Sequence, residues 1–238
     1  FSKNFMSSNK LPTADYKEFD DATRAKKYLE TKKSPLVVKY GGLAAGKGVD
    51  ICNTLDEARE SISKLLKSGD KIIIEDFIRG IELSSIYICN PNASKNNIGL
   101  PWIKDYKSRD EYNSGPNTGG MGSITHPFCS YKKNDVYALN IEIEKILIKT
   151  IVAINSLSGT TSKYNGFLFL GLMISADDDK PYLLEYNCRM GDPETQSIMM
   201  YLHKNDIDFL DLIGFDNSKY PDNFNLTFID NKKYSGFS

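Results

Sequence analysis

The segment from Tyr182 to Gln196, YLLEYNCRMGDPETQ, carries the side chains best suited to chemistry. It opens as an apolar strand and then places Glu185, Asn187 and Arg189 at alternate positions, so all three are expected on one face of that strand. Mg²⁺ binds carboxylate and amide oxygens and completes its shell with water and substrate phosphates. The spacing therefore predicts a metal–nucleotide site. A strand end with a solvated polar face is the alternative explanation of the same pattern.

A glycine-rich turn at residues 41–48 offers a second feature suited to phosphate, and the strand before it ends at Lys39. Small residues let backbone N–H groups approach phosphate oxygens, and Lys47 adds a charge inside the turn. The turn fits the GxxxxGK pattern, but Gly48 replaces the Ser or Thr that Mg²⁺ requires, and a strand follows instead of a helix. We therefore reject a P-loop fold and expect a glycine-rich flap between two strands. A flexible hairpin without a ligand is the alternative.

A second glycine-rich stretch, GPNTGGMG at 115–122, has four glycines in eight residues. Glycines so dense have no use in a core, because they contribute no side chain and allow positive φ angles. We expect a loop whose backbone closely approaches a ligand. A tight buried turn is the alternative.

The surrounding pattern alternates between helix and strand. Helices are expected at 20–32, 54–69, 133–157 and 195–202, and strands at 35–39, 49–52, 71–78, 83–89, 101–107, 166–175 and 181–186. Thr54 and Glu57 form a capping box at the start of the second helix. The long third helix is expected to have Ile141, Ile148 and Val152 along one face. The fold class is therefore α/β, with α+β character.

The bulk composition excludes several classes of protein. The chain has 238 residues, 40% of them hydrophobic and 26% charged, which suits one large or two small globular domains. A net charge of −1 gives no global field to attract nucleic acid or a membrane, and no apolar run reaches the length of about 18 residues that spans a bilayer. The four cysteines lie far apart and are expected to be reduced and mostly buried, which favours a cytoplasmic location.

The chain starts within a helical pattern, FSKNFM, which has neither an initiator methionine nor a cap. We expect residues 1–12 to be a helical remnant and the chain to be a fragment.

Three motifs together resemble the ATP-grasp enzymes, and among them the phosphoribosylamine–glycine ligase family. These motifs are GLAAGKG at 42–48, GPNTGGMG at 115–122 and EYNCRMGDPETQ at 185–196, in the family's order. The resemblance implies two subdomains that clamp ATP, with residues 13–78 as the lid and 79–238 as the catalytic subdomain. It also implies that an N-terminal and a C-terminal domain of the family are missing here.

The activity implied by the resemblance is ATP-dependent ligation of glycine to 5-phosphoribosylamine through a glycyl phosphate. The cofactors implied are ATP and Mg²⁺ or Mn²⁺, and the partners are these small substrates without nucleic acid or membrane. The residues that the resemblance assigns to the nucleotide are Lys3, Lys39, Gly42, Gly46, Lys47, Gly48, Glu75, Asp76, Phe77, Ile78 and Glu82. Those assigned to the metal are Glu185 and Asn187, and those assigned to catalysis are Lys107, Arg189 and Asp192. Those assigned to the substrates are Asp105, Asn117, Thr118, Gly119, Gly120, Met121, Gly122, Arg189 and Asp192.

Two stretches depart from the family pattern. The family has an acid before GLAAGKG, where this chain has Tyr40-Gly41, and it has QDHKR where this chain has KDYKS at 104–108. An ATP-grasp ligase of another carboxylate and amine is one alternative, but it would lack GPNTGGMG. A noncatalytic nucleotide-binding module, as one part of a larger purine-synthesis polypeptide, is another, and it would lack Glu185 or Asn187.

Overall fold

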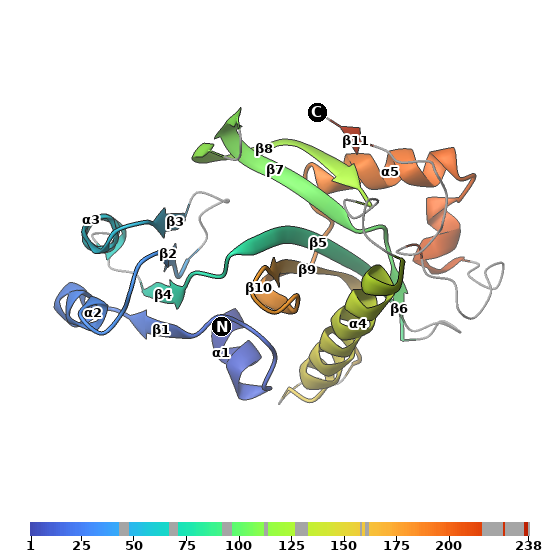
Figure 1. The fold of residues 1–238 in the computed structure, drawn as a ribbon. Helices are drawn as coiled ribbons and strands as arrows, with labels where there is room; N and C mark the ends of the chain where they lie inside the picture. The colour runs from blue at the N-terminus through green and yellow to red at the C-terminus, as the bar shows by residue number, and fades with distance from the viewer. Residues whose placement is uncertain are drawn as a thin grey trace.

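The computed structural model describes residues 1–42, 48–66, 71–91, 97–111, 114–126, 133–157, 159, 162–215, 226 and 236–237. Two sheets organise these residues, one of four strands and one of seven (Figure 1). The smaller sheet and its two helices lie on the left of Figure 1, and the larger sheet crosses the centre. Mixed helices and antiparallel sheets confirm the predicted α+β character. Within the described ranges, no helix is long and apolar enough to cross a bilayer.

The smaller sheet has the strand order β1-β4-β2-β3, and each neighbouring pair is antiparallel. Its elements are β1 (Tyr16–Phe19), α2 (Ala22–Leu29), β2 (Leu36–Tyr40), β3 (Val49–Cys52), α3 (Leu55–Leu65) and β4 (Ile72–Asp76). The sequence predicted all of them except β1. That strand has only four residues, and its two central side chains are charged, so it carries little apolar periodicity.

One face of the smaller sheet is covered by its helices. Leu36, Val38, Ile72 and Ile74 are buried and pack in one cluster with α2 and α3. Successive strand residues point to opposite faces, so the neighbours Lys39 and Glu75 leave from the face that the helices do not cover.

Side-chain caps fix the starts of both helices. Asp21 accepts a hydrogen bond from the backbone N–H of Arg24, and Thr54 accepts one from that of Glu57. The capping box is confirmed only in this half, because the Glu57 carboxylate accepts from the N–H of Asn53 at 2.7 Å. Helix α3 ends at Leu65, and the predicted end at residue 69 lies outside the described residues.

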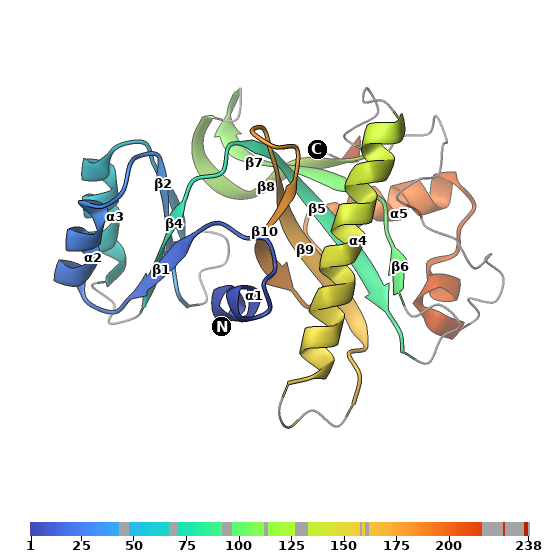
Figure 2. The same cartoon turned by 60° about the horizontal axis from the view of Figure 1, so that its bottom comes forward.

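The larger sheet has the order β10-β9-β5-β7-β8-β11, with β6 paired to β5. Its strands are β5 (Gly80–Cys89), β6 (Asn97–Gly99), β7 (Ile103–Asp110), β8 (Ser114–Thr125), β9 (Gly166–Ser175), β10 (Pro181–Asn187) and β11 (Gly236–Phe237). Helices α4 (Lys133–Asn155) and α5 (Glu194–Lys204) lie on its opposite faces (Figures 1 and 2). Helix α1 (Ser2–Ser8) joins the core on the α4 side, and a π-helical turn, Asp211–Phe215, follows α5.

Two cores define the faces of this sheet. On the α4 face, Leu83, Leu170 and Leu172 pack with Ile143 and Leu147. The α5 face holds the second core, made by buried residues of the sheet, of α5 and of the chain after it: Ile86, Ile88, Ile98, Leu100, Ile103, Phe169, Ile198, Tyr201, Leu202, Leu212 and Leu226.

The face of α4 expected to carry Ile141, Ile148 and Val152 is not the face that packs on the sheet. Ile141, Ile148 and Val152 are 37%, 57% and 61% exposed, whereas Ile143 and Leu147 are buried against the sheet. This helix has apolar residues on more than one side, so helical periodicity alone does not select the side that packs.

Candidate functional site

A shift in strand pairing places the first two predicted side chains on the α5 face. In β10, Leu183 pairs with Leu172 of β9, but Glu185 pairs with Gly171, so one extra residue lies between them. The extra residue moves Glu185 to the face opposite Leu183. Asn187 follows on the same face and donates from Nδ2 to Glu185 Oε1 at 3.5 Å. The strand ends there, so its alternation does not extend to Arg189, which donates to the Met190 carbonyl.

Gly171 keeps open the space that Glu185 occupies. A Cβ at this position would lie 2.9 Å from Cγ of Glu185, closer than side chains normally approach. Gly171 is not among the residues predicted from the sequence to belong to the site. A glycine inside the apolar strand FLFLGLMIS was the available signal, because such a glycine marks a close approach by another group.

Lys107 lies beside three acids on the α5 face. Its Nζ is 2.6 Å from Glu82 Oε1 and 3.7 Å from Asp105 Oδ2. Burial alone would lower the pKa of Lys107, but the charges of Glu82, Asp105 and Glu185 together raise it above the usual lysine range. Residues predicted to contact the nucleotide, the substrates and the metal thus meet in one network.

Asp105 lies at the buried end of this network, with its side chain 5% exposed. Burial, reinforced by Glu194 and Glu82 and opposed by Lys107, raises its pKa to about 6. Its Oδ1 is buried without a hydrogen-bond partner among the residues that the structure describes. A carboxyl group in this position favours its protonated form more than an exposed one does.

The stability of the protein should therefore depend on Asp105 in weakly acidic solution. Between the unfolded pKa of about 4 and the folded value of about 6, the folded state binds more protons, so stability falls as pH rises through this window. We expect the free energy of unfolding to fall by about 2 kcal/mol more in wild type than in Asp105→Asn across it. Urea unfolding at a series of pH values measures this, and parallel curves for the two proteins would contradict it.

A second cluster joins α1 to the smaller sheet. Glu75 Oε2 lies 3.0 Å from Lys3 Nζ and 3.1 Å from Lys39 Nζ, and the side chains of Glu75 and Lys3 are 2% and 5% exposed. Burial lowers the pKa of Lys3, and Lys39 adds to this while Glu75 opposes it. Two lysines share one carboxylate, so the cluster can carry a net positive charge, which suits phosphate.

Hydrogen bonds continue from Lys3 to the larger sheet. Its Nζ donates to Thr13 Oγ1 at 2.6 Å, and that hydroxyl donates to the Leu183 carbonyl of β10 at 2.7 Å. Residues 76–78 also link the two sheets, because they lead from β4 into β5. Asp76 at their start pairs with Lys32 at 2.6 Å.

The predicted loop at 115–122 is instead part of strand β8. The register between β8 and β7 is irregular here. Tyr106 pairs with Gly122 and Ser108 with Asn117, so the four residues 118–121 of β8 lie opposite the single residue Lys107 of β7. Thr118 Oγ1 donates to the Lys107 carbonyl at 2.8 Å. The dense glycines argued against a strand, but they permit this irregular pairing.

One of these glycines brings β8 against the motif that follows β10. Gly120 has φ +130°, and a Cβ there would lie 2.6 Å from Cδ of Pro193. Asp192, the residue before that proline, accepts from Gln196 Nε2 at 2.8 Å. The structure thus places the second and third sequence motifs side by side.

The first glycine motif is described only at its edges. Gly46 and Lys47 lie outside the described residues. Gly42 is exposed, and the Gly48 carbonyl accepts from the N–H of Tyr40 at 2.7 Å, which closes the turn between β2 and β3.

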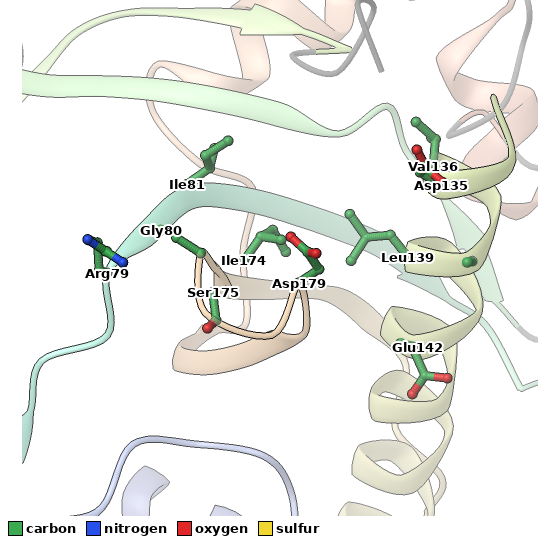
Figure 3. Close-up of a pocket in the computed structure, with 12 residues that line it drawn as sticks. Arg79, Gly80, Ile81, Asp135, Val136, Leu139, Glu142, Ile174, Ser175 and Asp179 are labelled. Atoms are coloured by element: carbon green, nitrogen blue, oxygen red, sulfur yellow. The ribbon is translucent and has the colours of Figure 1, made fainter. Parts of the chain in front are cut away.

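Two hollows lie in the described part of the molecule. One, of about 730 Å³, is lined by β3 and α3 on one side and by Gly115 and Asn117 of β8 on the other. The other, of about 660 Å³, lies on the α4 face, where Arg79, Asp135 and Asp179 surround an apolar floor (Figure 3). This second hollow contains none of the predicted site residues.

The donor set at Glu185 and Asn187 fits Mg²⁺ held in part by phosphate. Among the described residues, no group of three or more His, Cys, Asp or Glu side chains could hold a metal ion by itself. Mg²⁺ is usually bound by one or two carboxylates together with substrate phosphates and water. Two neighbouring oxygen-bearing side chains are therefore sufficient.

Comparisons with known protein families, curated proteins and solved structures all give matches to one family. The family model of the phosphoribosylglycinamide synthetase ATP-grasp (A) domain matches residues 1–195. A phosphoribosylamine–glycine ligase of Clostridium acetobutylicum is 37% identical over 239 aligned positions, which cover 97% of this chain and 53% of that protein. The chain thus spans about half the length of the curated relatives it matches.

Solved structures of two ligases are also similar to this chain. The crystal structure of phosphoribosylamine–glycine ligase from Thermotoga maritima has a TM-score of 0.71 and 34% identity, covering 83% of this chain and 49% of that one. The structure of D-alanine–D-alanine ligase from Bacillus anthracis complexed with ATP has a TM-score of 0.60 and 18% identity, covering 89% and 63%. The second likeness concerns the fold alone. The predicted ATP-grasp fold is confirmed.

Proposed function

Because the chain belongs to the phosphoribosylglycinamide synthetase ATP-grasp (A) domain family, we propose that it is the ATP-binding and catalytic part of a phosphoribosylamine–glycine ligase. The observation that carries this proposal is the charged network on the α5 face. There Glu185 and Asn187 lie side by side, and the neighbouring Lys107 has its pKa raised, against the effect of burial, by Glu82 first and then by Asp105 and Glu185. Two metal-binding side chains beside a lysine would supply the positioning and charge neutralisation on which phosphoryl transfer depends.

In the proposed reaction, a glycine carboxylate oxygen attacks the γ-phosphorus of ATP, and ADP leaves. The amine nitrogen of 5-phosphoribosylamine then attacks the carbonyl carbon of glycyl phosphate, phosphate leaves, and the nitrogen loses a proton. Glu185 and Asn187 would hold Mg²⁺ or Mn²⁺, which supplies charge neutralisation for the phosphate oxygens.

The remaining residues bind and orient the substrates. Lys3 and Lys39 neutralise phosphate charge from the Glu75 cluster, and Arg189 suits a planar carboxylate or phosphate. Asp192, an exposed acid, receives the ammonium group of glycine. The remaining predicted contacts, with the nucleotide or the substrates, keep their proposed roles: Gly42, Gly46, Lys47, Gly48, Asp76, Phe77, Ile78, Glu82, Asp105, Asn117, Thr118, Gly119, Gly120, Met121 and Gly122.

The two sheets suggest the domain roles. We assign residues 13–78 to a lid and 79–238 to the catalytic subdomain, with residues 1–12 leading into this unit. The charged face of the smaller sheet, with Lys39 and Glu75, supports this division, because its helices cover the other face. A cytoplasmic location remains a prediction.

The direct test is ADP release by the purified chain with Mg²⁺-ATP and freshly made 5-phosphoribosylamine, with and without glycine, together with a separate ATP titration. Release that requires both glycine and the amine would establish the ligase. ATP binding without release would favour the alternative of a nucleotide-binding fragment that is inactive by itself. Release with another carboxylate or amine, but not with these, would favour a different ATP-grasp ligase.

Lys39→Met should weaken ATP binding while leaving the fold intact. Loss of one phosphate-facing charge is expected to raise the Kd for ATP by about tenfold, or about 1.4 kcal/mol. Lys71→Met is the matched control, because Lys71 is exposed and pairs with Glu18 at 2.6 Å on the smaller sheet. Equal ATP affinity in the two variants, measured by calorimetry, would remove Lys39 from the site.

A further inference from the structure

Glu194 is a buried acid that the proposed mechanism does not use. It is the first residue of α5, and its side chain is 3% exposed. Its Oε1 accepts a hydrogen bond from Ser84 Oγ of β5 at 3.0 Å. Ser84 lies two residues after Glu82 on the same face of that strand, so Glu194 reaches directly beneath the charged network.

The other carboxylate oxygen lies against the turn between β10 and α5. A Cβ at Gly191 would be 2.3 Å from Glu194 Oε2 and 2.6 Å from its Cδ. The carboxylate therefore fills the space where any other residue at 191 would place a side chain. The Gly191 carbonyl accepts from the N–H of Thr195 at 3.2 Å, which fixes the same residue from the backbone side.

We propose that Glu194 is a positioning residue, which holds the turn at residues 188–193 against β5 so that Arg189 and Asp192 stay in place relative to Lys107. What this turn binds rests on the proposed function, whereas its attachment to β5 does not. Two further residues take part in this positioning. Ser84 fixes the carboxylate by its hydrogen bond, and Gly191 lets the turn approach the carboxylate closely.

A purely structural role for Glu194 would predict different behaviour. An acid in the first turn of a helix also stabilises that helix through its dipole. Loss of that effect would lower the stability of the whole protein and would affect glycine and ATP alike. Loss of positioning would instead act on the ligand that contacts the turn.

The test uses two matched pairs of variants of the chain. Glu194→Ala removes the contact with Ser84, and Glu194→Gln keeps an oxygen that can accept it. Ser84→Ala removes the donor, and Ser85→Ala is its control, because Ser85 is equally buried but points to the α4 face. Thermal unfolding of the four variants will check that each one folds.

The kinetic readout separates the two roles. We expect Glu194→Ala to raise the KM for glycine at least about tenfold and the Kd for ATP less than about twofold, with Glu194→Gln within about threefold of wild type for both. Ser84→Ala should raise the KM for glycine about fivefold, and Ser85→Ala should leave it unchanged. An equal rise for glycine and ATP in Glu194→Ala would overturn the proposal.

A second readout does not depend on ligase activity. Cys188, the first residue of the turn, is exposed, whereas Cys52 and Cys89 are buried, so the prediction of mostly buried cysteines is confirmed for those two and wrong for Cys188. Cys129 lies outside the described residues. We expect the reaction rate of Cys188 with dithiobis(nitrobenzoate) to rise several-fold in Glu194→Ala but not in Glu194→Gln, with Cys188→Ser identifying its share of the signal. An unchanged rate in Glu194→Ala would overturn the positioning role. If wild type lacks turnover, the proposed function fails, and this rate still decides the role of Glu194.

Discussion

Replacing Glu185 with alanine is expected to abolish ADP formation with Mg²⁺, glycine and 5-phosphoribosylamine. Mg²⁺ takes few protein ligands, so losing the carboxylate of the proposed two-residue donor set would remove most of the geometry that the protein imposes on the ion. The variant also removes one of the acids that raise the pKa of Lys107. We expect turnover to fall at least about 100-fold. Even replacing a residue that only hydrogen-bonds to a metal ligand typically lowers metal affinity or activity by about 10- to 100-fold.

Coupled-enzyme detection of ADP at saturating ATP measures this effect. Glu142→Ala is the control, because Glu142 is a half-exposed acid on α4 and pairs with Lys145 at 2.6 Å, on the other side of the sheet. Excess Mg²⁺ or Mn²⁺ should restore part of the activity of Glu185→Ala. Wild-type turnover in that variant would refute the metal assignment.

Gly80→Ala is expected to lower the free energy of unfolding more than any other change predicted to act on stability. Gly80 begins β5 opposite Ser175, and a Cβ there would lie 1.9 Å from the carbonyl oxygen of Ile174 and 2.8 Å from its carbonyl carbon. Both atoms belong to the backbone of β9, so no side-chain rotation relieves the overlap. The strands would have to separate, at a cost of about 2–4 kcal/mol.

Urea unfolding followed by circular dichroism measures this loss as a lower midpoint. Gly119→Ala provides the control, because a Cβ at Gly119 meets no heavy atom within 4 Å. That change is expected to leave stability within about 0.5 kcal/mol of wild type. Equal midpoints for the two variants would show that β5 and β9 are not held as closely as described.

Elements with strong local signals could be predicted from the sequence almost to the residue. Strand β9, expected at 166–175, is found there, because its apolar run is short and lies between turn residues, which favours a strand over a helix. The alternation of Glu185 and Asn187 was likewise readable from a period of two. The face on which they lie was not, since it depends on the extra residue after Leu183, which only the pairing with β9 reveals.

Features that depend on contacts between distant segments could not be predicted. The glycines at 115–122 suggested a loop, because nothing in the sequence shows that β7 pairs with them or that Pro193 approaches Gly120. Glu194 was missed for the same reason, because it is an ordinary acid at a helix start until the fold places Ser84 beside it. Gly171 differs, because a glycine inside an apolar strand signals a close approach, although its partner Glu185 is known only from the fold.

The ion pair between Lys3 and Glu75 restricts how the two sheets can rotate relative to each other. Lys3 belongs to α1 and is tied through Thr13 to β10, whereas Glu75 belongs to the smaller sheet. Rotating the smaller sheet away would separate the two charges of this buried ion pair and would leave Glu75 with Lys39 as its ion-pair partner, so the contact acts as a latch. Because both groups are shielded from solvent, dissolved salt should loosen the latch far less than it loosens surface ion pairs.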